Sequence, residues 1–518
     1  MRAMTKKWLA CAIVVLVSLI VVAQLSAAPQ KHNDWTPDWW TGYSIAIPNV
    51  PVPDGYPPLS THARYLGELK GSWKEIGQQY GEKAGDLMVF VFDGWYGAVN
   101  EKMSWEEIKY RIQQYENETL RWYSPELLEI IEGMADGASN YFEQSIYYDE
   151  SGMTPYEMIL AINLYYEINS YPPIISEFSA SGISSSSEGD LEGNLGCSSI
   201  ALLPPATATG QVIHASSKDQ RFWPQCYGVM YTMVPVGQPG PSGKPNTLFR
   251  VGTAGELSGM KVVNDKGFTI SGHAGGNVGA RTDPYYPDFT FGVPAQFALA
   301  QTAFFSNNLE EGINNLVYGS DYYRNNTGRT IVQWSRGFNS LLSDPVSACV
   351  VEQNPYRYAV RFPGDLGERD NAYIVQTNHN ACNFSYDEND ELSDIPMTRF
   401  GDGYSTTTVS GLTGSGNRFW TLTWLAELWF ERITEYDVMN SFWTRDFYFW
   451  EDGFKDFDAA AVGTVANKAG RVSGQVNVQI SIPCEKEHKL FWTVGTPPDW
   501  RGPWDSWILE KHFPHSRR

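Results

Sequence analysis

Among the cysteines of this 518-residue chain, Cys197 lies in the setting that best suits nucleophilic chemistry. It follows Gly196 and opens a short apolar run, and a second short run ends at Asp219. A Ser/Gly-rich stretch over 178–193 leads into it, with a composition typical of a flexible linker. A thiolate attacks carbonyl carbons, whereas a buried or disulfide-bonded cysteine is inert. The segment 194–219 therefore holds either a thiol nucleophile or a structural cysteine.

The first 28 residues have the layout of a secretory signal peptide. Positive residues precede an apolar run from Trp8 to Leu25, and small residues at 26–28 suit a cleavage site. An uncleaved anchor is the alternative, because about 18 apolar residues approach a bilayer span. We expect an exported protein, in a secreted, periplasmic or lysosome-like compartment, with no stable membrane anchor after signal removal.

The cysteine count bears on the state of Cys197. Of six cysteines, Cys11 leaves with the signal, and five is an odd number in an oxidising compartment. The count predicts two disulfides and one free thiol, with Cys197 as the free one and the pairing of the others left open. Three sequons predict a glycoprotein if the host is a eukaryote, at Asn117, Asn325 and Asn383.

Composition excludes several classes of function. The net charge is −21, and such an acidic chain repels phosphate backbones, so we expect no nucleic-acid partner. Aromatic residues make up 14% of the chain, which indicates packing or contact with sugar or lipid. The sequence has no phosphate-binding loop, zinc-protease motif, paired-cysteine motif or serine-nucleophile elbow, and the acidic segment 387–391 lacks the spacing of a calcium loop. We expect neither a metal nor a cofactor.

The apolar pattern changes along the chain from helical to extended. Capping boxes and an N-terminal proline predict four helices between residues 66 and 167, beginning near Ser72, Ser104, Ser124 and Thr154. Short alternating or apolar runs then predict strands, with helical patterns at 294–318 and 417–433. The predicted strands are 198–203, 211–216, 229–235, 247–251, 267–273, 373–377, 471–482 and 489–494. This order indicates an α+β architecture, with antiparallel sheets covered by helices.

Six stretches, in order over residues 66–430, resemble the isopenicillin N acyltransferase-like family of N-terminal-nucleophile (Ntn) hydrolases. This family is related to acid ceramidase-like amidases, acylethanolamine-hydrolysing amidases and choloylglycine hydrolase. The stretches are Leu69–Gly81, Ser124–Ala138, Glu157–Glu167, Gly196–Ser199, Asn264–Gly267 and Thr377–His379. Each is weak alone, but together they make the resemblance specific.

The resemblance implies the Ntn αββα sandwich, two facing antiparallel sheets between helical layers. It also implies a zymogen that is cut autocatalytically between Gly196 and Cys197. The expected organisation is a signal peptide over 1–28, an irregular arm over 29–65, a helical α chain over 66–196 that includes the linker, and a catalytic β chain over 197–518. The two fragments are expected to remain associated.

Cleavage would give Cys197 both a thiol and an α-amine. The amine titrates near pH 8 when unperturbed, so it can take the thiol proton without a neighbouring histidine. The thiolate would attack a linear amide of a small-molecule acyl substrate and form a thioester, which water or another amine resolves. Without coenzyme A outside the cell, hydrolysis is expected rather than acyl transfer.

The resemblance also implies partners for Cys197. Asp219 would hold the new α-amine, the alternative being a hairpin-end aspartate on the surface. Ser216 stands where the ceramidase-like branch has an arginine, so that arginine's substrate contacts do not carry over. Asn378 is a candidate oxyanion donor.

For two further roles, the second oxyanion donor and the family's arginine, this sequence offers more than one candidate residue. The position of the family's second asparagine falls at His273, so the donor is the His273 ring, a Gly-rich backbone segment, or Asn277. His273 as a hydrogen-bonded core residue is the other interpretation. Arg418, at the start of a helix, fits the arginine's context better than Arg399 does.

Two functions from other classes stand beside the amidase. One is a catalytically silent Ntn-fold protein that binds glycan or lipid through aromatic residues, favoured by the changes at Ser216 and His273. The other is a carbohydrate-active enzyme with paired carboxylates, which explains the acidity and aromatic content but none of the ordered motifs.

Overall fold

The structure is a computed structural model, and its described residues all belong to one compact unit, Ser44–Arg518. They are 63–100, 103–169, 196–220, 227–237, 239–259, 261–274, 290–353, 355, 358–378, 415–442, 447–450, 453–456, 475–482, 489–495 and 505–508. The predicted signal, almost all of the arm, and the linker 178–193 lie outside these ranges. Asn277, Arg399 and the acidic segment 387–391 lie outside them as well.

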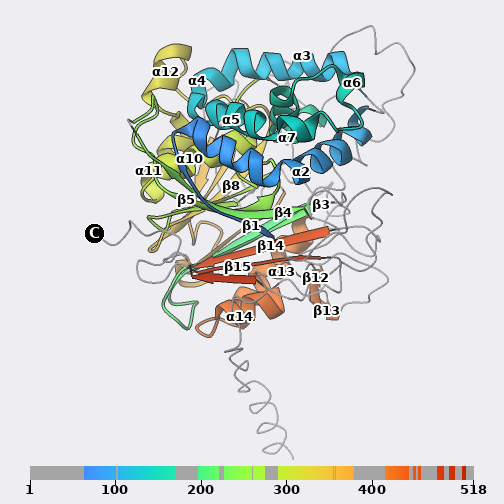
Figure 1. Ribbon diagram of the computed structural model, residues 1–518. Coiled ribbons are helices and arrows are strands. Elements are labelled where there is room, and N and C mark those ends of the chain that lie inside the picture. Colours follow the sequence, from blue (N-terminus) through green and yellow to red (C-terminus); the bar gives the residue numbers. More distant parts are fainter. Residues whose placement is uncertain are drawn as a thin grey trace, which may run out of the picture. The chain divides into compact units, whose positions relative to one another are not determined.

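Two sheets lie face to face in the described part of the chain (Figure 1). The larger has the order β1 (Arg64–Gly71), β4 (Gly228–Pro235), β5 (Leu248–Thr253), β6 (Lys261–Asn264), β7 (Thr269–Ala274), β8 (Phe338–Ser343), β9 (Ala348–Gln353) and β10 (Tyr358–Arg361). The smaller has the order β11 (Tyr373–Gln376), β2 (Gly196–Leu202), β3 (Ile213–Gln220), β14 (Gln475–Ile482), β15 (Lys489–Gly495) and β16 (Asp505–Ile508). Adjacent strands are antiparallel except β1 and β4, which are parallel.

Helices cover the outer faces of both sheets. The eight-stranded sheet contacts α2 (Trp73–Asn100), α10 (Ala295–Phe305) and α11 (Leu309–Tyr318), and α5 (Pro125–Phe142) and α7 (Pro155–Asn169) pack on α2. The six-stranded sheet contacts α13 (Ser415–Leu428), with α14 (Glu435–Asp437) on the same side (Figure 1). The expected αββα sandwich is confirmed.

Smaller elements complete the described structure. They are α3 (Trp105–Tyr115), a π-helical turn (Glu116–Leu120), α4 (Arg121–Tyr123), α6 (Tyr148–Ser151), α12 (Asp321–Thr327), a 3-10 turn (Arg369–Asn371), a second π-helical turn (Val438–Phe442) and the hairpin β12 (Phe447–Trp450) and β13 (Gly453–Asp456). None of the described helices is long and apolar enough to cross a membrane.

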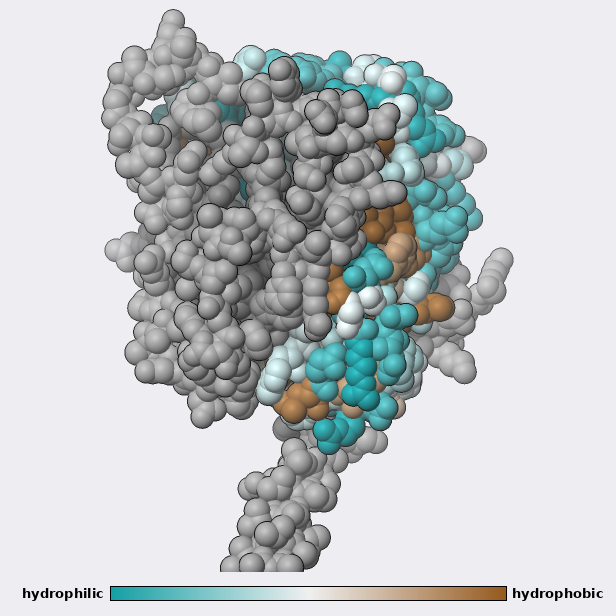
Figure 2. All heavy atoms as spheres, turned by 180° about the vertical axis from the view of Figure 1, so that it is seen from behind, coloured by the Kyte–Doolittle hydropathy of each residue, from teal (hydrophilic) through white to brown (hydrophobic). Residues whose placement is uncertain are grey.

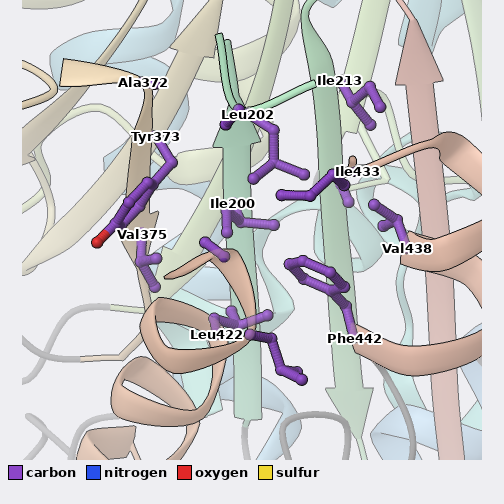
Figure 3. Packing of buried hydrophobic residues seen from close by; sticks show 14 of the residues in the cluster. Ile200, Leu202, Ile213, Ala372, Tyr373, Val375, Leu422, Ile433, Val438 and Phe442 are labelled. Carbon is purple, nitrogen blue, oxygen red and sulfur yellow. The ribbon is translucent and has the colours of Figure 1, made fainter. Parts of the chain in front are cut away.

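The two faces of β2 have different chemistry because successive side chains of a strand point to opposite sides. Ile200 and Leu202 point to the outer side, where they pack with Leu422 of α13 and with Phe442 (Figure 3). Ser199 faces the other sheet, where its Oγ lies 3.0 Å from Oγ of Ser271 on β7. The polar residues at the start of β2 are thus held between the sheets by an apolar layer behind them.

Three of the predicted helix starts have the predicted local signals. Reciprocal capping boxes join Ser72 to Glu75 and Thr154 to Glu157, so α2 and α7 begin where expected. At α5, Pro125 occupies the first turn. Such signals can be read from sequence because a capping box satisfies backbone N–H groups at a helix start, and proline fits the first turn.

The remaining capping box, at Ser104, has a glutamate that also makes an ion pair. The Ser104 side chain accepts from the Glu107 backbone N–H at 3.2 Å, as expected. The Glu107 carboxylate pairs with Nε of Arg111 at 2.7 Å, and neither side chain has any exposed surface. The sequence analysis did not predict this buried ion pair.

The prediction of one helical segment over 294–318 is corrected to two helices. Asn308 caps α11 through its side chain, which accepts from the Glu311 N–H at 3.0 Å, so α10 ends at Phe305 and a new helix begins. The sequence analysis also missed β1, which lies where the arm and the helical region were expected to meet, and β6, β8, β9, β10 and β16, together with the hairpin β12–β13. Strands β8 and β9 are buried throughout, so they lack the polar–apolar alternation on which the other predictions relied.

The expectation of two disulfides and one free thiol is wrong at Cys349. This residue is a buried free cysteine on β9, and burial raises the pKa of its thiol. Cys197 is in no disulfide either. Of the five cysteines that follow the predicted signal, Cys226, Cys382 and Cys484 are left for pairing, and all three lie outside the described residues. The count assumed that an exported cysteine is either paired or reactive, whereas Cys349 is a small core residue.

The described surface gives little support for a lipid-binding face. On the side shown in Figure 2 it is mainly hydrophilic, with smaller hydrophobic areas between. Exposed large apolar side chains come from separate elements: Tyr65, Tyr110, Ile146, Val236, Val346, Phe362 and Leu428. Two sequon asparagines, Asn117 and Asn325, are exposed, and glycosylation stays a prediction.

Helices α2 and α5 approach each other through glycines spaced four residues apart on both helices. A Cβ added at Gly133 would lie 2.0 Å from the Lys74 carbonyl oxygen, and one at Gly77 would lie 2.0 Å from the Ile130 carbonyl oxygen. Gly81 and Gly137 repeat the arrangement one turn along, each at 2.3 Å from a backbone oxygen of the other helix. Only glycine allows backbones to come this close.

Replacing Gly133 with alanine is expected to destabilise the protein despite alanine's higher helix propensity. The added methyl group must push α2 and α5 apart, with a cost of about 3 kcal/mol that exceeds the propensity gain of about 1 kcal/mol. Denaturant unfolding of the purified protein measures the change. Asn140→Ala, at an exposed position of the same helix, is the control and should not lower stability. Equal stability of G133A and wild type would contradict the close packing.

Candidate active site

The Gly196–Cys197 peptide bond lies at the start of β2, in an uncut chain. β2 pairs with β3 so that Gly196 is opposite Asp219 and Cys197 is opposite Lys218. Cys197 is 5% exposed. Because directly opposite residues in an antiparallel pair share a face, Cys197 and Lys218 are side-chain neighbours, with Cβ atoms about 5 Å apart.

The backbone nitrogen of Cys197 is bound by Asn378, two residues beyond β11. The Cys197 N–H donates to Oδ1 of Asn378 at 2.6 Å, and Nδ2 of Asn378 donates to the Ala274 carbonyl oxygen at 2.9 Å. Both partners fix the orientation of the amide, since an N–H needs an acceptor and a carbonyl needs a donor. Asn378 thereby joins β2 to the end of β7 and holds the nitrogen of the bond that is expected to be cut.

His273 lies one residue before Ala274, on β7, and its side chain is fully buried. Its Nδ1 lies 3.2 Å from the Asn339 carbonyl oxygen, so this nitrogen carries the hydrogen. In the neutral ring Nε2 then accepts from Oγ of Ser199 at 2.6 Å. His273 connects β7 to β2 two residues past Cys197, and its role as an oxyanion donor stays a prediction.

The hydrogen-bond chain continues from Ser199 between the sheets. Oγ of Ser271 donates to Ser199, Nε2 of His214 donates to Ser271 at 2.8 Å, and Nδ1 of His214 accepts from Ser343 at 2.8 Å. Burial, and then the nearby Lys261, lower the pKa of His214 well below its ordinary value, so its ring is neutral. With these donors and acceptors, each hydrogen bond of the chain has one donor and one acceptor. A buried polar network whose hydrogen bonds are all made is rigid.

Lys218 is a buried lysine, 4% exposed, in an ion pair beside Cys197. Its Nζ lies 2.6 Å from Oε1 of Glu256, and Nη2 of Arg250 lies 3.8 Å from the other carboxylate oxygen. Burial lowers the pKa of Lys218, and the Glu256 carboxylate opposes that change. Gln296 donates to Glu256 at 3.1 Å and so helps to hold the carboxylate. The three charged side chains together carry one excess positive charge.

Two aromatic residues from the helical layer enclose the lysine. Nζ of Lys218 lies 5.8 Å from the ring centre of Trp95 on α2 and 5.6 Å from that of Tyr166 on α7. Burial, followed by the charges of Glu256 and Cys197, raises the pKa of Tyr166 well above its ordinary value, so its hydroxyl stays protonated. Both rings precede Gly196 in the chain, so the site uses residues from each side of that bond.

The structure brings Cys197 and Asn378 into contact and places His273 close to both. Asp219 is at the end of β3, paired with Gly196, and Arg418 is in the first turn of α13. The side chains of Asp219 and Arg418 are outside the described part of the structure, so their predicted roles remain predictions.

Sequence reasoning missed Lys218, Glu256, Tyr166 and Trp95. For Lys218 the sequence does hold a signal. A lysine stands directly before Asp219 in a predicted strand, next to small residues that are buried in the structure. Glu256 lies in a glycine-containing turn between β5 and β6, and only the fold brings it to β3. No pattern in α2 or α7 distinguishes Trp95 or Tyr166 from ordinary core residues.

A depression of about 790 Å³ lies elsewhere on the protein and is a poorer candidate for an active site. It is lined by 241–243, α11, α12 and neighbouring residues. Its serine hydroxyls have structural partners, because Ser242 bonds to Glu126 and Gln301, and Ser320 caps α12. Among the described residues no cluster of three or more His, Cys, Asp or Glu could hold a metal ion.

Comparison with known proteins gives matches to solved structures alone. No family model and no curated protein sequence matches the chain. A cysteine-to-alanine mutant of the conjugated bile acid hydrolase from Clostridium perfringens is similar to it, with a TM-score of 0.34 and 11% identity over 61% of this chain and 93% of that one. So is the N-acylethanolamine-hydrolyzing acid amidase ortholog of Caenorhabditis elegans, with a TM-score of 0.32 and 12% identity over 60% of this chain and 100% of that one.

Proposed function

We propose that this chain is an exported precursor that cuts its own Gly196–Cys197 bond and then hydrolyses a linear amide through a Cys197 thioester. One observation carries the proposal: the 2.6 Å hydrogen bond from the Cys197 nitrogen to Oδ1 of Asn378, at the start of a buried strand. This bond supports the proposal because a polar side chain holds the nitrogen that would leave Gly196 and become the catalytic amine.

The cut is an acyl shift followed by hydrolysis. The Cys197 thiolate attacks the Gly196 carbonyl carbon, and the carbon–nitrogen bond breaks while the nitrogen takes a proton, which leaves a thioester. Water then hydrolyses the thioester to a Gly196 carboxylate and a free Cys197 thiol. Asn378 supports this shift because its hydrogen bond holds the leaving nitrogen in place.

Turnover repeats the same chemistry on a substrate amide. The new α-amine, held by Asn378 and in the prediction also by Asp219, takes the thiol proton and gives it to the leaving amine. The thiolate forms an acyl thioester, and water releases the acid. Hydrolysis is proposed rather than transfer, and the substrate is a small N-acyl amine or acyl-amino acid.

The two fragments are proposed to stay together after the cut. β1 and the helices α2, α5 and α7 precede Gly196, and β1 is paired along its length with β4, which follows it. Separating the fragments would expose the inner face of α2 and remove an edge strand from the eight-stranded sheet.

Mass spectrometry and end sequencing of the purified protein test the proposal. We expect two co-purifying fragments, one ending at Gly196 and one beginning at Cys197, and release of free acid from N-acyl amines. A wild-type preparation that hydrolyses amides while every chain is intact at Gly196 would rule out the proposed processing. Cut protein that is inactive on all amide classes would instead favour the silent binding protein.

A further inference from the structure

The self-cleavage step lacks the base that serves turnover. Before the cut, the Cys197 nitrogen is part of an amide, which accepts no proton near neutral pH. The thiol must therefore ionise without help from an α-amine. Cys197 is also 5% exposed, and burial by itself disfavours the charged thiolate.

The charged groups around Cys197 offset this cost. Lys218 is its cross-strand neighbour, and the lysine contacts Glu256 at 2.6 Å, with Arg250 at 3.8 Å from the same carboxylate. Two positive side chains thus share one carboxylate in a region where all three are at most 4% exposed. Tyr166 faces the same space with a protonated hydroxyl. A negative charge at Sγ of Cys197 would balance the excess.

We infer that Lys218, held by Glu256 and Arg250, is a positioning residue that favours the Cys197 thiolate in the uncut chain and thereby drives self-cleavage at Gly196–Cys197. The inference rests on the proposed function. The thiol proton leaves to solvent before the attack, and a proton returns to the Cys197 nitrogen when the carbon–nitrogen bond breaks. Lys218 itself neither gains nor loses a proton overall. The aromatic rings of Trp95 and Tyr166 keep water from screening its charge.

The experiment follows conversion of the freshly made full chain into two fragments. Cell-free synthesis supplies labelled chain, translation is stopped, and the conversion rate is measured on gels between pH 5 and 10. Lys218→Met keeps the side-chain volume and makes the cluster neutral. Since an opposite charge within 4–6 Å shifts a pKa by 1–3 units, we expect conversion at pH 7 to slow by about 10- to 1000-fold, with its pH midpoint moved upward.

Two further variants separate charge from structure. Lys218→Arg retains the charge and should restore most of the rate at the wild-type midpoint. Lys261→Met removes another buried lysine, whose Nζ donates to the His214 carbonyl oxygen at 2.8 Å. This variant should leave the pH midpoint of conversion unchanged. Circular dichroism of each chain reports on folding.

The outcomes distinguish the inference from the proposed function. An equal loss at every pH in K218M would show a structural role and overturn the inference. So would a wild-type midpoint at or above about 8.5, the value of an unperturbed thiol, and this result needs no variant to fold. If the wild-type chain never converts, the proposed function itself fails. If K218M converts at the wild-type rate, the inference about Lys218 is overturned, while the proposed function still stands.

Discussion

Replacing Cys197 with alanine is expected to leave the chain uncut and to abolish amide hydrolysis. In the proposed mechanism both reactions use the same sulfur, which attacks first the Gly196 carbonyl and then the substrate. Loss of a nucleophile in comparable hydrolases lowers the turnover rate by a factor on the order of 10⁶, so no activity above background should remain. Fragment analysis and an acid-release assay on one preparation measure both losses.

Cys349→Ala is the matched control for this variant. Cys349 is the second described cysteine outside any disulfide, and it lies on β9 in the core. Its removal should cost some stability and leave both cleavage and hydrolysis in place. Full processing of Cys197→Ala would show that another group cuts the chain, and the assignment of Cys197 would then be wrong.

Replacing Asn378 with leucine is expected to slow self-cleavage by about two orders of magnitude. Leucine has a similar size but neither accepts from the Cys197 N–H nor donates to the Ala274 carbonyl, so the scissile nitrogen loses its anchor and β2 its link to β7. The loss of one precisely placed hydrogen bond in a reacting centre typically costs 10²–10³ in rate. Conversion of pulse-labelled chain into fragments gives the rate.

Asn246→Leu controls for the general effect of removing an asparagine side chain that makes a structural hydrogen bond. Asn246 donates to the Ser306 carbonyl oxygen at 2.9 Å, so its loss also breaks a buried hydrogen bond without involving Cys197. We expect it to lower the melting temperature while cleavage proceeds at the wild-type rate per folded chain. Equal slowing in both variants would mean that Asn378 acts only through stability.

How far the sequence predicts this molecule depends on the range of the signals involved. The α2 and α7 starts follow from capping boxes within four residues and the α5 start from Pro125, and the β2–β3 hairpin follows from two apolar runs around a turn. The split between α10 and α11 was missed because one asparagine, Asn308, decides it. Strands buried on both faces, such as β8 and β9, carry no alternation to detect.

The site shows the same division. Cys197 and Asn378 are found from ordered motifs, but the partner of each is set by tertiary packing. The motifs suggested Asn378 as an oxyanion donor, but its hydrogen bond to the Cys197 nitrogen comes only from the fold. The role of Asp219 toward the amine stays a prediction. Glu256 reaches Lys218 from another sheet, a contact between residues 38 positions apart that local patterns do not encode.

The location of Gly196 and Cys197 within β2 has a consequence for the kinetics of maturation. Both residues are paired to β3 and Cys197 is buried, so cleavage between them by a separate protease requires the start of β2 to separate from β3. In the proposed self-cleavage, cutting is a first-order event of each folded molecule, with the same half-time in dilute and concentrated samples. Folding would then be the trigger, because the bond is positioned for attack only when the strands from both halves of the chain have assembled.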